Sequence, residues 1–192
     1  MINVCCVFYG NKNDVNKVED LYNKVQKNLN FPFKFYCFTN ELNLFNNINN
    51  KILFKQLPRK DFLGWWNILQ LFNSKICLSG VNIFLDLNIK ITKNLNNFVT
   101  YENDNFFIIN ENFNTNIIKW NNKTASFIWE EYINKYFSIL HIKFNDEIAS
   151  IIYEEYKKKQ KNNVYYFNVE QVLKDIMKNN HLLKFFPKEL LL

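Results

Sequence analysis

The sequence has no long apolar run, and its opening stretch has none of the features of a secretion signal. Nothing in its 192 residues approaches the roughly 18 continuous apolar residues of a membrane-spanning helix. The stretch MINVCCVFYGNKND lacks a basic segment, and its apolar run is too short for a signal peptide. These absences predict a cytoplasmic protein, or one made in the cytoplasm of an infected host.

Glycine and proline are scarce, at three each, and no pair of cysteines has the CxxC spacing. Hydrophobic residues make up 48% of the chain and aromatic residues 18%, which is typical of a globular protein and excludes a disordered one. Three of the four cysteines lie in strand-like runs, so we expect buried free thiols in a reducing compartment. The cysteines are Cys5, Cys6, Cys37 and Cys77.

The formal net charge is +6, which favours anionic partners such as phosphates, nucleic acids or acidic lipid surfaces. The lysines are spread along the whole chain, and only 156–163 (YKKKQKNN) forms a tight cluster. A solvated helix end or loop explains that cluster better than a binding site does. Because the chain has no nucleic-acid-binding motif and no focused basic stripe, we expect no nucleic-acid partner.

The first forty residues read as a strand, a helix and a second strand. Residues 2–10 form an apolar run that ends at a glycine, and 13–30 has apolar residues at helical spacing with Asn13 or Asp14 as its cap. Residues 33–39 are again strand-like. A βαβ unit of this length requires a sheet that is at least partly parallel.

The rest of the chain continues the alternation of strands and helices, without a repeat or a linker. The sequence therefore predicts one α/β domain over 1–192, in which a mostly parallel sheet is flanked by helices and ligands bind beyond the carboxyl ends of the strands. We expect further strands at 51–57, 81–87, 105–110, 113–120 and 164–169, and further helices at 64–73, 124–140 and 145–160.

The stretch IFLDLNIKI places one carboxylate, Asp86, at the end of an apolar strand, and Asn88 follows two positions later. A charge there must be hydrated, paired or metal-bound, because an isolated buried charge is very costly. On an extended backbone both side chains would point to the same side and could hold a hard divalent cation. A structural aspartate that is capped or paired explains the same pattern about equally well.

Five stretches follow one another in the chain: INVCCVFYGNKNDVNKVEDLYNKVQKNLNFPFKFYCFTN, GWWNILQLFN, IFLDLNIKITKNLNNF, FNTNIIKWNNKTASFIWEEY and FNDEIASI. In this order they resemble the small GT-A-fold glycosyltransferases encoded in bacterial and viral polysaccharide gene clusters. The third stretch resembles the family block that carries the metal-binding DxD motif, and the last resembles its G-D-Q segment. The resemblance covers residues 1 to about 155 and leaves out the tail over 181–192.

The resemblance implies a glycosyltransferase with a nucleotide-sugar donor and a glycan or lipid-linked acceptor. The base and ribose of the donor would lie against Phe8, Tyr9 and Gly10 and against the strand end near Thr39. The family's metal, Mn²⁺ or Mg²⁺, would bridge the diphosphate to the DxD-like pair at 86 and 88.

Two further positions take their roles from the same resemblance. Asn116 would contact the sugar. Asp146 would touch the acceptor or the transferred sugar, and in an inverting enzyme a carboxylate there would act as general base. The two neighbouring tryptophans Trp65 and Trp66 are more simply explained by packing than by sugar binding.

Several departures from the family pattern weaken this prediction. Asn88 keeps a carbonyl oxygen but lacks the charge of the second DxD acid, so we expect weaker metal binding. Ile68 stands where the family has Lys or Arg, and the family's closing H-G-K-P-like motif is missing, which leaves His181 as a weak metal candidate. The alternative is a catalytically impaired GT-A-fold protein that binds a nucleotide sugar or glycan, or serves as an interaction module.

The apolar and basic tail over 181–192 has two interpretations. It is either a short helix that closes the core or a surface for peripheral contact with a membrane or partner. The first interpretation is the simpler one, because the segment is short and rich in Leu and Phe.

Overall fold

The computed structural model describes residues 1–10, 14–46, 48–62, 64–76, 78–101, 107–109, 114–134, 169–178 and 183–187. One sheet contains the strands β1 (Ile2–Phe8), β2 (Phe33–Thr39), β3 (Ile52–Gln56), β4 (Val81–Leu85), β5 (Phe107–Ile109), β6 (Ile117–Asn121) and β7 (Leu183–Phe185). The α-helices are α1 (Asn16–Asn28), α2 (Asn96–Thr100), α3 (Asn122–Tyr132) and α6 (Val169–Met177), and the 3₁₀ helices are η2 (Leu42–Phe45) and η3 (Gly64–Phe72).

The strands lie in the order β3-β2-β1-β4-β6-β5-β7. β1 is parallel to β2 and β4, β2 is parallel to β3, and β5 is parallel to β7. Among the described strands only β6 reverses direction, and it runs antiparallel to both β4 and β5. The mostly parallel α/β sheet expected from the sequence is therefore confirmed.

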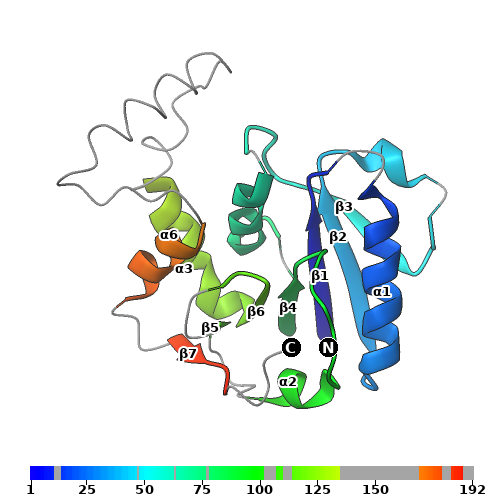
Figure 1. Ribbon diagram of the computed structural model, residues 1–192. Coiled ribbons are helices and arrows are strands. Elements are labelled where there is room, and N and C mark those ends of the chain that lie inside the picture. The colour runs from blue at the N-terminus through cyan, green and yellow to red at the C-terminus, as the bar shows by residue number, and fades with distance from the viewer. Residues whose placement is uncertain are drawn as a thin grey trace, which may run out of the picture.

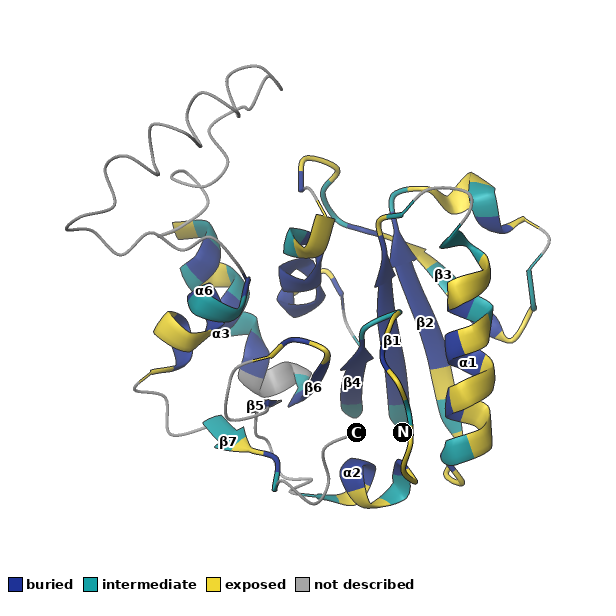
Figure 2. Ribbon diagram, in the orientation of Figure 1, coloured by how far each residue is buried: buried dark blue, intermediate teal, exposed yellow. Residues whose placement is uncertain are grey.

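Side chains of β1 alternate between two hydrophobic cores, one on each face of the sheet. Cys5 and Val7 pack with η3, α3 and α6, whereas Val4, Cys6 and Phe8 pack with α1 and α2. Figure 1 shows α1 on one side of the sheet and α3 and α6 on the other, and Figure 2 shows the central strands buried between them. Burial on both faces explains why these strands read as continuous apolar runs.

Helix α1 begins later than its sequence suggests, and no side chain caps it. The N-cap position is Val15, which has no side chain able to accept a hydrogen bond, so the predicted cap at Asp14 is wrong and Asn13 lies outside the described residues. Asp14 forms an ion pair with Lys17 at 2.7 Å instead. Amphipathic burial along one face, not capping, therefore holds the helix to the sheet.

The helix expected over 64–73 is present as the 3₁₀ helix η3. Its last six residues are buried, whereas its first turn emerges into solvent. Trp66 stacks on Tyr132 of α3, with ring centroids 6.1 Å apart. Trp65 is 52% exposed, so the packing interpretation holds for Trp66 only.

The strands expected over 105–110 and 113–120 are present as β5 and β6, and the helix expected from 124 begins two residues earlier as α3. The helix predicted over 145–160 and residues 164–168 of the last predicted strand lie outside the described residues. Helix α6 was not predicted. No helix in the described part of the chain combines the length and hydropathy of a membrane span.

The described part of the tail forms an edge strand. β7 pairs with β5, and the next residue, Phe186, is 3% exposed and stacks on Phe98 of α2 with ring centroids 3.9 Å apart. The tail therefore closes the core, as the simpler interpretation expected, but it does so as a strand and not as a helix.

Candidate functional site

The strand order reverses between β1 and β4. From β1 the chain adds β2 and β3 on one side, and it then returns to place β4 on the other side of β1. In open α/β sheets, ligands bind at such a switch point, beyond the carboxyl ends of the two strands. Tyr9 and Gly10 follow β1 and Asp86 follows β4, so the sheet brings these predicted residues to one edge.

Asp86 lies in a tight turn and not on extended backbone. β4 ends at Leu85, and the amide of Ile89 donates to the Asp86 carbonyl at 3.1 Å, which closes a β-turn. Inside this turn the amide of Asn88 donates to Oδ1 of Asp86 at 2.8 Å. The sequence predicted that the side chains of Asp86 and Asn88 project from one extended strand. This prediction is wrong, because β4 ends at Leu85 and both residues belong to the turn that follows it.

The carboxylate of Asp86 is half-buried, and Asn88 is exposed. Among the residues that the structure describes, Asp86 has no ion-pair partner. Its backbone amide donates to the carbonyl of Asn116 at 2.9 Å, which ties the start of β6 to the end of β4. The side chain thus stands at the open end of the sheet with one oxygen atom engaged by the turn.

The negative charge of Asp86 affects the pKa of Tyr9 in the loop after β1. Desolvation raises the pKa of the Tyr9 phenol, and the negative charge of Asp86 raises it further. The Tyr9 side chain is 45% exposed, so the phenol borders solvent beside the carboxylate. At Gly10 a Cβ atom would lie 3.0 Å from Oδ2 of Asp14, so a side chain there would crowd the start of α1.

Two of the predicted donor-binding residues have side chains that face inward. Phe8 is fully buried and packs edge-on against Phe45, with ring centroids 5.0 Å apart. Thr39 is also fully buried, and its Oγ1 accepts a hydrogen bond from the amide of Glu41 at 2.9 Å. Neither side chain reaches the surface, so only the backbone of these residues is left to contact a ligand.

The residues before β6 border the Asp86 turn, and one of them contacts Glu170, which the sequence analysis did not identify. Asn116 is exposed, as its predicted contact with a sugar requires. The hydroxyl of Thr115 donates to Oε1 of Glu170 in the first turn of α6 at 2.8 Å. Glu170 was missed because α6 was not predicted and because 55 residues separate the two partners.

Three other candidates remain to be placed. Asp146 and His181 lie outside the described residues. Ile68 is 2% exposed and belongs to the core under η3, so position 68 faces the core in this chain and not the edge of the sheet.

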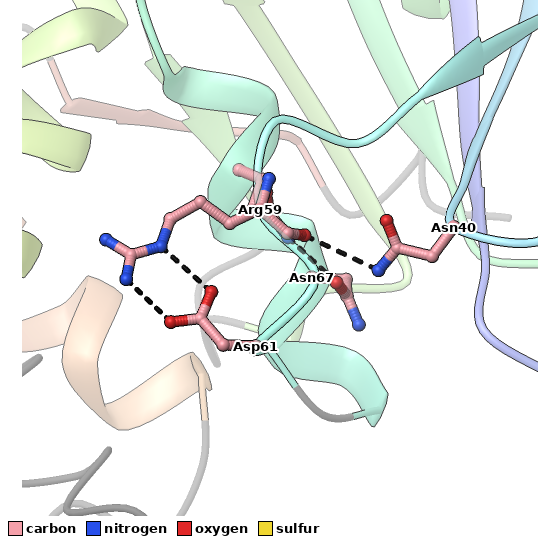
Figure 3. A network of polar contacts seen from close by, with 5 residues as sticks. Asn40, Arg59, Asp61 and Asn67 are labelled. Carbon is pink, nitrogen blue, oxygen red and sulfur yellow. Dashed lines mark hydrogen bonds and ion pairs between the residues drawn. The ribbon is translucent and has the colours of Figure 1, made fainter.

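A polar network holds the segment that follows β3 (Figure 3). Arg59 pairs with Asp61 through two contacts of 2.9 and 2.6 Å, which raise the pKa of the guanidinium. The buried side chain of Gln70 accepts from the Arg59 amide at 2.7 Å and donates to the Arg59 carbonyl at 3.0 Å and to Asn67 at 2.8 Å. Asn40, which follows β2, donates to the same carbonyl at 3.4 Å. These bonds fix the loop at the carboxyl edge of β2 and β3.

The residues of the Asp86 turn fit a hard divalent cation. Carboxylate and amide oxygens are the ligands that Mg²⁺ and Mn²⁺ accept, and Mg²⁺ is often held by one or two carboxylates plus phosphate oxygens and water. Asp86 offers an oxygen that the turn leaves free, and the Asn88 amide is exposed. In the described part of the chain, no three His, Cys, Asp or Glu residues are grouped to hold a metal by themselves.

Comparison with known proteins identifies the architecture. No family model matches the chain, and no curated protein matches its sequence. The galactosyltransferase LgtC, in complex with donor and acceptor sugar analogues, superimposes with a TM-score of 0.58 at 13% identity over 96% of this chain and 73% of LgtC. The glycosyltransferase GlyE of Streptococcus pneumoniae TIGR4 gives a TM-score of 0.55 at 12% identity over 97% of this chain.

The chain spans 45% of the length of GlyE. At identities this low the likeness establishes the fold alone: the chain has the α/β architecture of GT-A glycosyltransferases.

Proposed function

We propose that this chain is a metal-assisted glycosyltransferase that moves a sugar from a nucleoside-diphosphate sugar to a glycan or lipid-linked acceptor. The observation that carries the proposal is the half-buried Asp86 carboxylate, which stands at the switch point of a GT-A-like sheet without an ion-pair partner in the described residues. Burying a charge is costly unless it is paired, so a half-buried carboxylate without a cationic side chain beside it is suited to bind a cation.

Each residue at this edge has a role in the proposal. Asp86 and Asn88 would hold Mn²⁺ or Mg²⁺, and the metal would supply a Lewis acid for the charge of the leaving diphosphate. Tyr9 and Gly10 border the base and ribose, and the Tyr9 phenol can donate a hydrogen bond because a phenol is protonated near neutral pH. Its raised pKa extends this protonated form to higher pH. Asn116, tied through its carbonyl to the Asp86 amide, contacts the transferred sugar.

The buried donor-site residues act through their backbone. Phe8 and Thr39 anchor the ends of β1 and β2, so the loops after them present main-chain groups at a fixed place. Asp146 remains the proposed contact to the acceptor or the transferred sugar, and it is the general base if the reaction inverts the anomeric centre.

A catalytically impaired GT-A protein that binds a nucleotide sugar or glycan is the second candidate. The observation in its favour is that Asn88 replaces an acid and that its amide already occupies Oδ1 of Asp86. Both features weaken the affinity of this turn for a cation. Turnover separates the two candidates, because only the enzyme hydrolyses a bound donor slowly in the absence of an acceptor.

The test is a thermal-shift screen of UDP- and GDP-sugars with and without Mn²⁺. We expect one donor to raise the melting temperature only with the metal, and a donor at about 100 times its Kd stabilises by about 2.7 kcal/mol. Asp86→Ala abolishes the shift, whereas Asp20→Ala, which removes an exposed acid from α1, preserves it. Asn88→Asp increases the metal-dependent shift.

Other outcomes of this screen would refute the proposal. A shift that survives Asp86→Ala, or that needs no metal, places the donor elsewhere. Donor binding without hydrolysis, across a broad panel of acceptors, favours the impaired protein.

A further inference from the structure

A concave feature lies on the face of the sheet that η3 covers. It is a groove of about 530 Å³ between β3 and the segment that follows η3, and its walls include Lys55, Lys75 and Leu78. Cavities of about 300–1,000 Å³ are the usual size for small-molecule sites. The groove shares no residue with the Asp86 turn.

The floor of the groove is apolar because core residues form it. Phe38, Leu57 and Ile76 belong to the core under η3 and are at most 7% exposed, and the half-buried Leu78 packs against them. The apolar surface open to a ligand therefore comes chiefly from Leu78 and the half-buried Pro58.

The rim of the groove is positively charged. Lys55 is the cross-strand partner of Phe38, so its side chain leaves the sheet on the face that bears the floor. Lys55 and Lys75 are both exposed, and neither has an ion-pair partner within the part of the chain that the structure describes. None of the described residues that line the groove is acidic, and the loop acid Asp61 is held by Arg59.

We propose that this groove binds a single anionic amphiphile, a phosphate monoester that carries an apolar chain. The two ammonium groups suit a phosphate because it is a dianion with three acceptor oxygens, and lysine binds phosphate as a point charge. The apolar chain lies on the floor between Phe38 and Leu78. This site is separate from the proposed donor site, and its existence does not depend on glycosyl transfer.

Calorimetric titration of the full chain tests the proposal with decyl phosphate, hexyl phosphate and inorganic phosphate, each kept below its micelle concentration. We expect decyl phosphate to bind, hexyl phosphate to bind more weakly by up to about fourfold per methylene removed, and inorganic phosphate to bind weakest. The double variant Lys55→Gln/Lys75→Gln weakens decyl phosphate binding at least about tenfold.

The matched control is Lys24→Gln/Lys27→Gln, which removes the same charge from exposed positions of α1 on the other face. We expect it to leave the affinity within about twofold, because a distant exposed charge is screened by salt. Circular dichroism and melting temperature confirm that both double variants fold.

Three results would overturn the proposal. Inorganic phosphate that binds as tightly as decyl phosphate shows that the floor plays no part. Equal losses in the two double variants show attraction by net charge alone. Binding only to anionic vesicles, with no binding of decyl phosphate, shows a membrane surface effect in place of a site for one molecule.

Discussion

At the scale of single residues, the carboxylate of Asp86 at the end of a buried strand affects the ionisation of a neighbouring side chain. Asp86 lies close enough to the loop after β1 to disfavour ionisation of Tyr9, although burial of the phenol has the larger effect. The two residues follow strands that are adjacent in the sheet, although they lie 77 positions apart along the chain. The phenol therefore reports on the charge state of the candidate site without any need for activity.

We expect Asp86→Asn to lower the pKa of Tyr9, because the change removes a negative charge that opposes the phenolate. The pKa stays above its ordinary value, since desolvation remains. NMR titration of labelled tyrosine measures the shift, with Tyr9→Phe used to assign the signal. Mg²⁺ with a nucleoside diphosphate should act in the same direction by neutralising Asp86.

Asp20→Asn serves as the control, because Asp20 is exposed on α1. A Tyr9 pKa that moves equally in both variants, or in neither, would contradict the arrangement of the site.

At the scale of elements, a buried lysine holds the shortest α-helix of the described chain in place. Lys119 of β6 is 2% exposed, and its ammonium group donates to the carbonyls of Phe98 (3.5 Å), Val99 (2.6 Å) and Tyr101. These carbonyls belong to the last turn of α2, where a cation complements the helix dipole. A helix of five residues cannot persist alone, so its position depends on tertiary contacts such as this one.

Lys119→Met should destabilise the protein by about 2–4 kcal/mol, because it leaves several buried carbonyls without a donor. Methionine keeps an unbranched apolar side chain of nearly the same length and removes the charged donor group. Chemical denaturation measures the loss, and hydrogen exchange should show it first at α2. Lys24→Met, at an exposed position of α1, should change the stability by less than about 0.5 kcal/mol.

At the scale of the whole molecule, the fold is completed by residues from the far end of the chain. β7 joins the sheet edge beside β5, and Phe186 then enters the core on the α1 side, where it stacks on Phe98. The hydroxyl of Tyr101, which follows α2, donates to the carbonyl of Phe185 in β7 at 3.4 Å, although the two residues are 84 positions apart. This bond fastens the end of α2 against the sheet. The core around α2 is thus shared between distant parts of the sequence.

Phe186→Ala should cost about 3–5 kcal/mol of unfolding free energy, because it removes a fully packed ring and leaves a cavity. The neighbouring Phe185 is 42% exposed, so Phe185→Ala is a control of the same chemistry and should cost about 1 kcal/mol or less. Denaturant unfolding of both variants measures the difference. Equal losses would mean that the ring of Phe186 lies outside the core.

Local sequence determined most of the elements of the first ninety residues. Apolar runs with turns after them predicted β1, β2, β3 and β4, because strands buried on both faces need such runs. The 3.6-residue spacing of Val18, Leu21, Tyr22 and Val25 predicted α1 for a similar reason. The resemblance carried the fold assignment, and the structural likeness to LgtC and GlyE confirms it.

Only the tertiary structure decided which of the predicted residues share an edge of the sheet and which lie in the core. Sequence spacing cannot tell that Phe8 and Thr39 turn inward while Tyr9 stays at the surface, or that Thr115 meets Glu170. It also cannot tell that β4 ends one residue before Asp86, because hydrogen bonds within the turn compete with strand pairing there. Such choices depend on contacts between distant segments, which a local pattern does not encode.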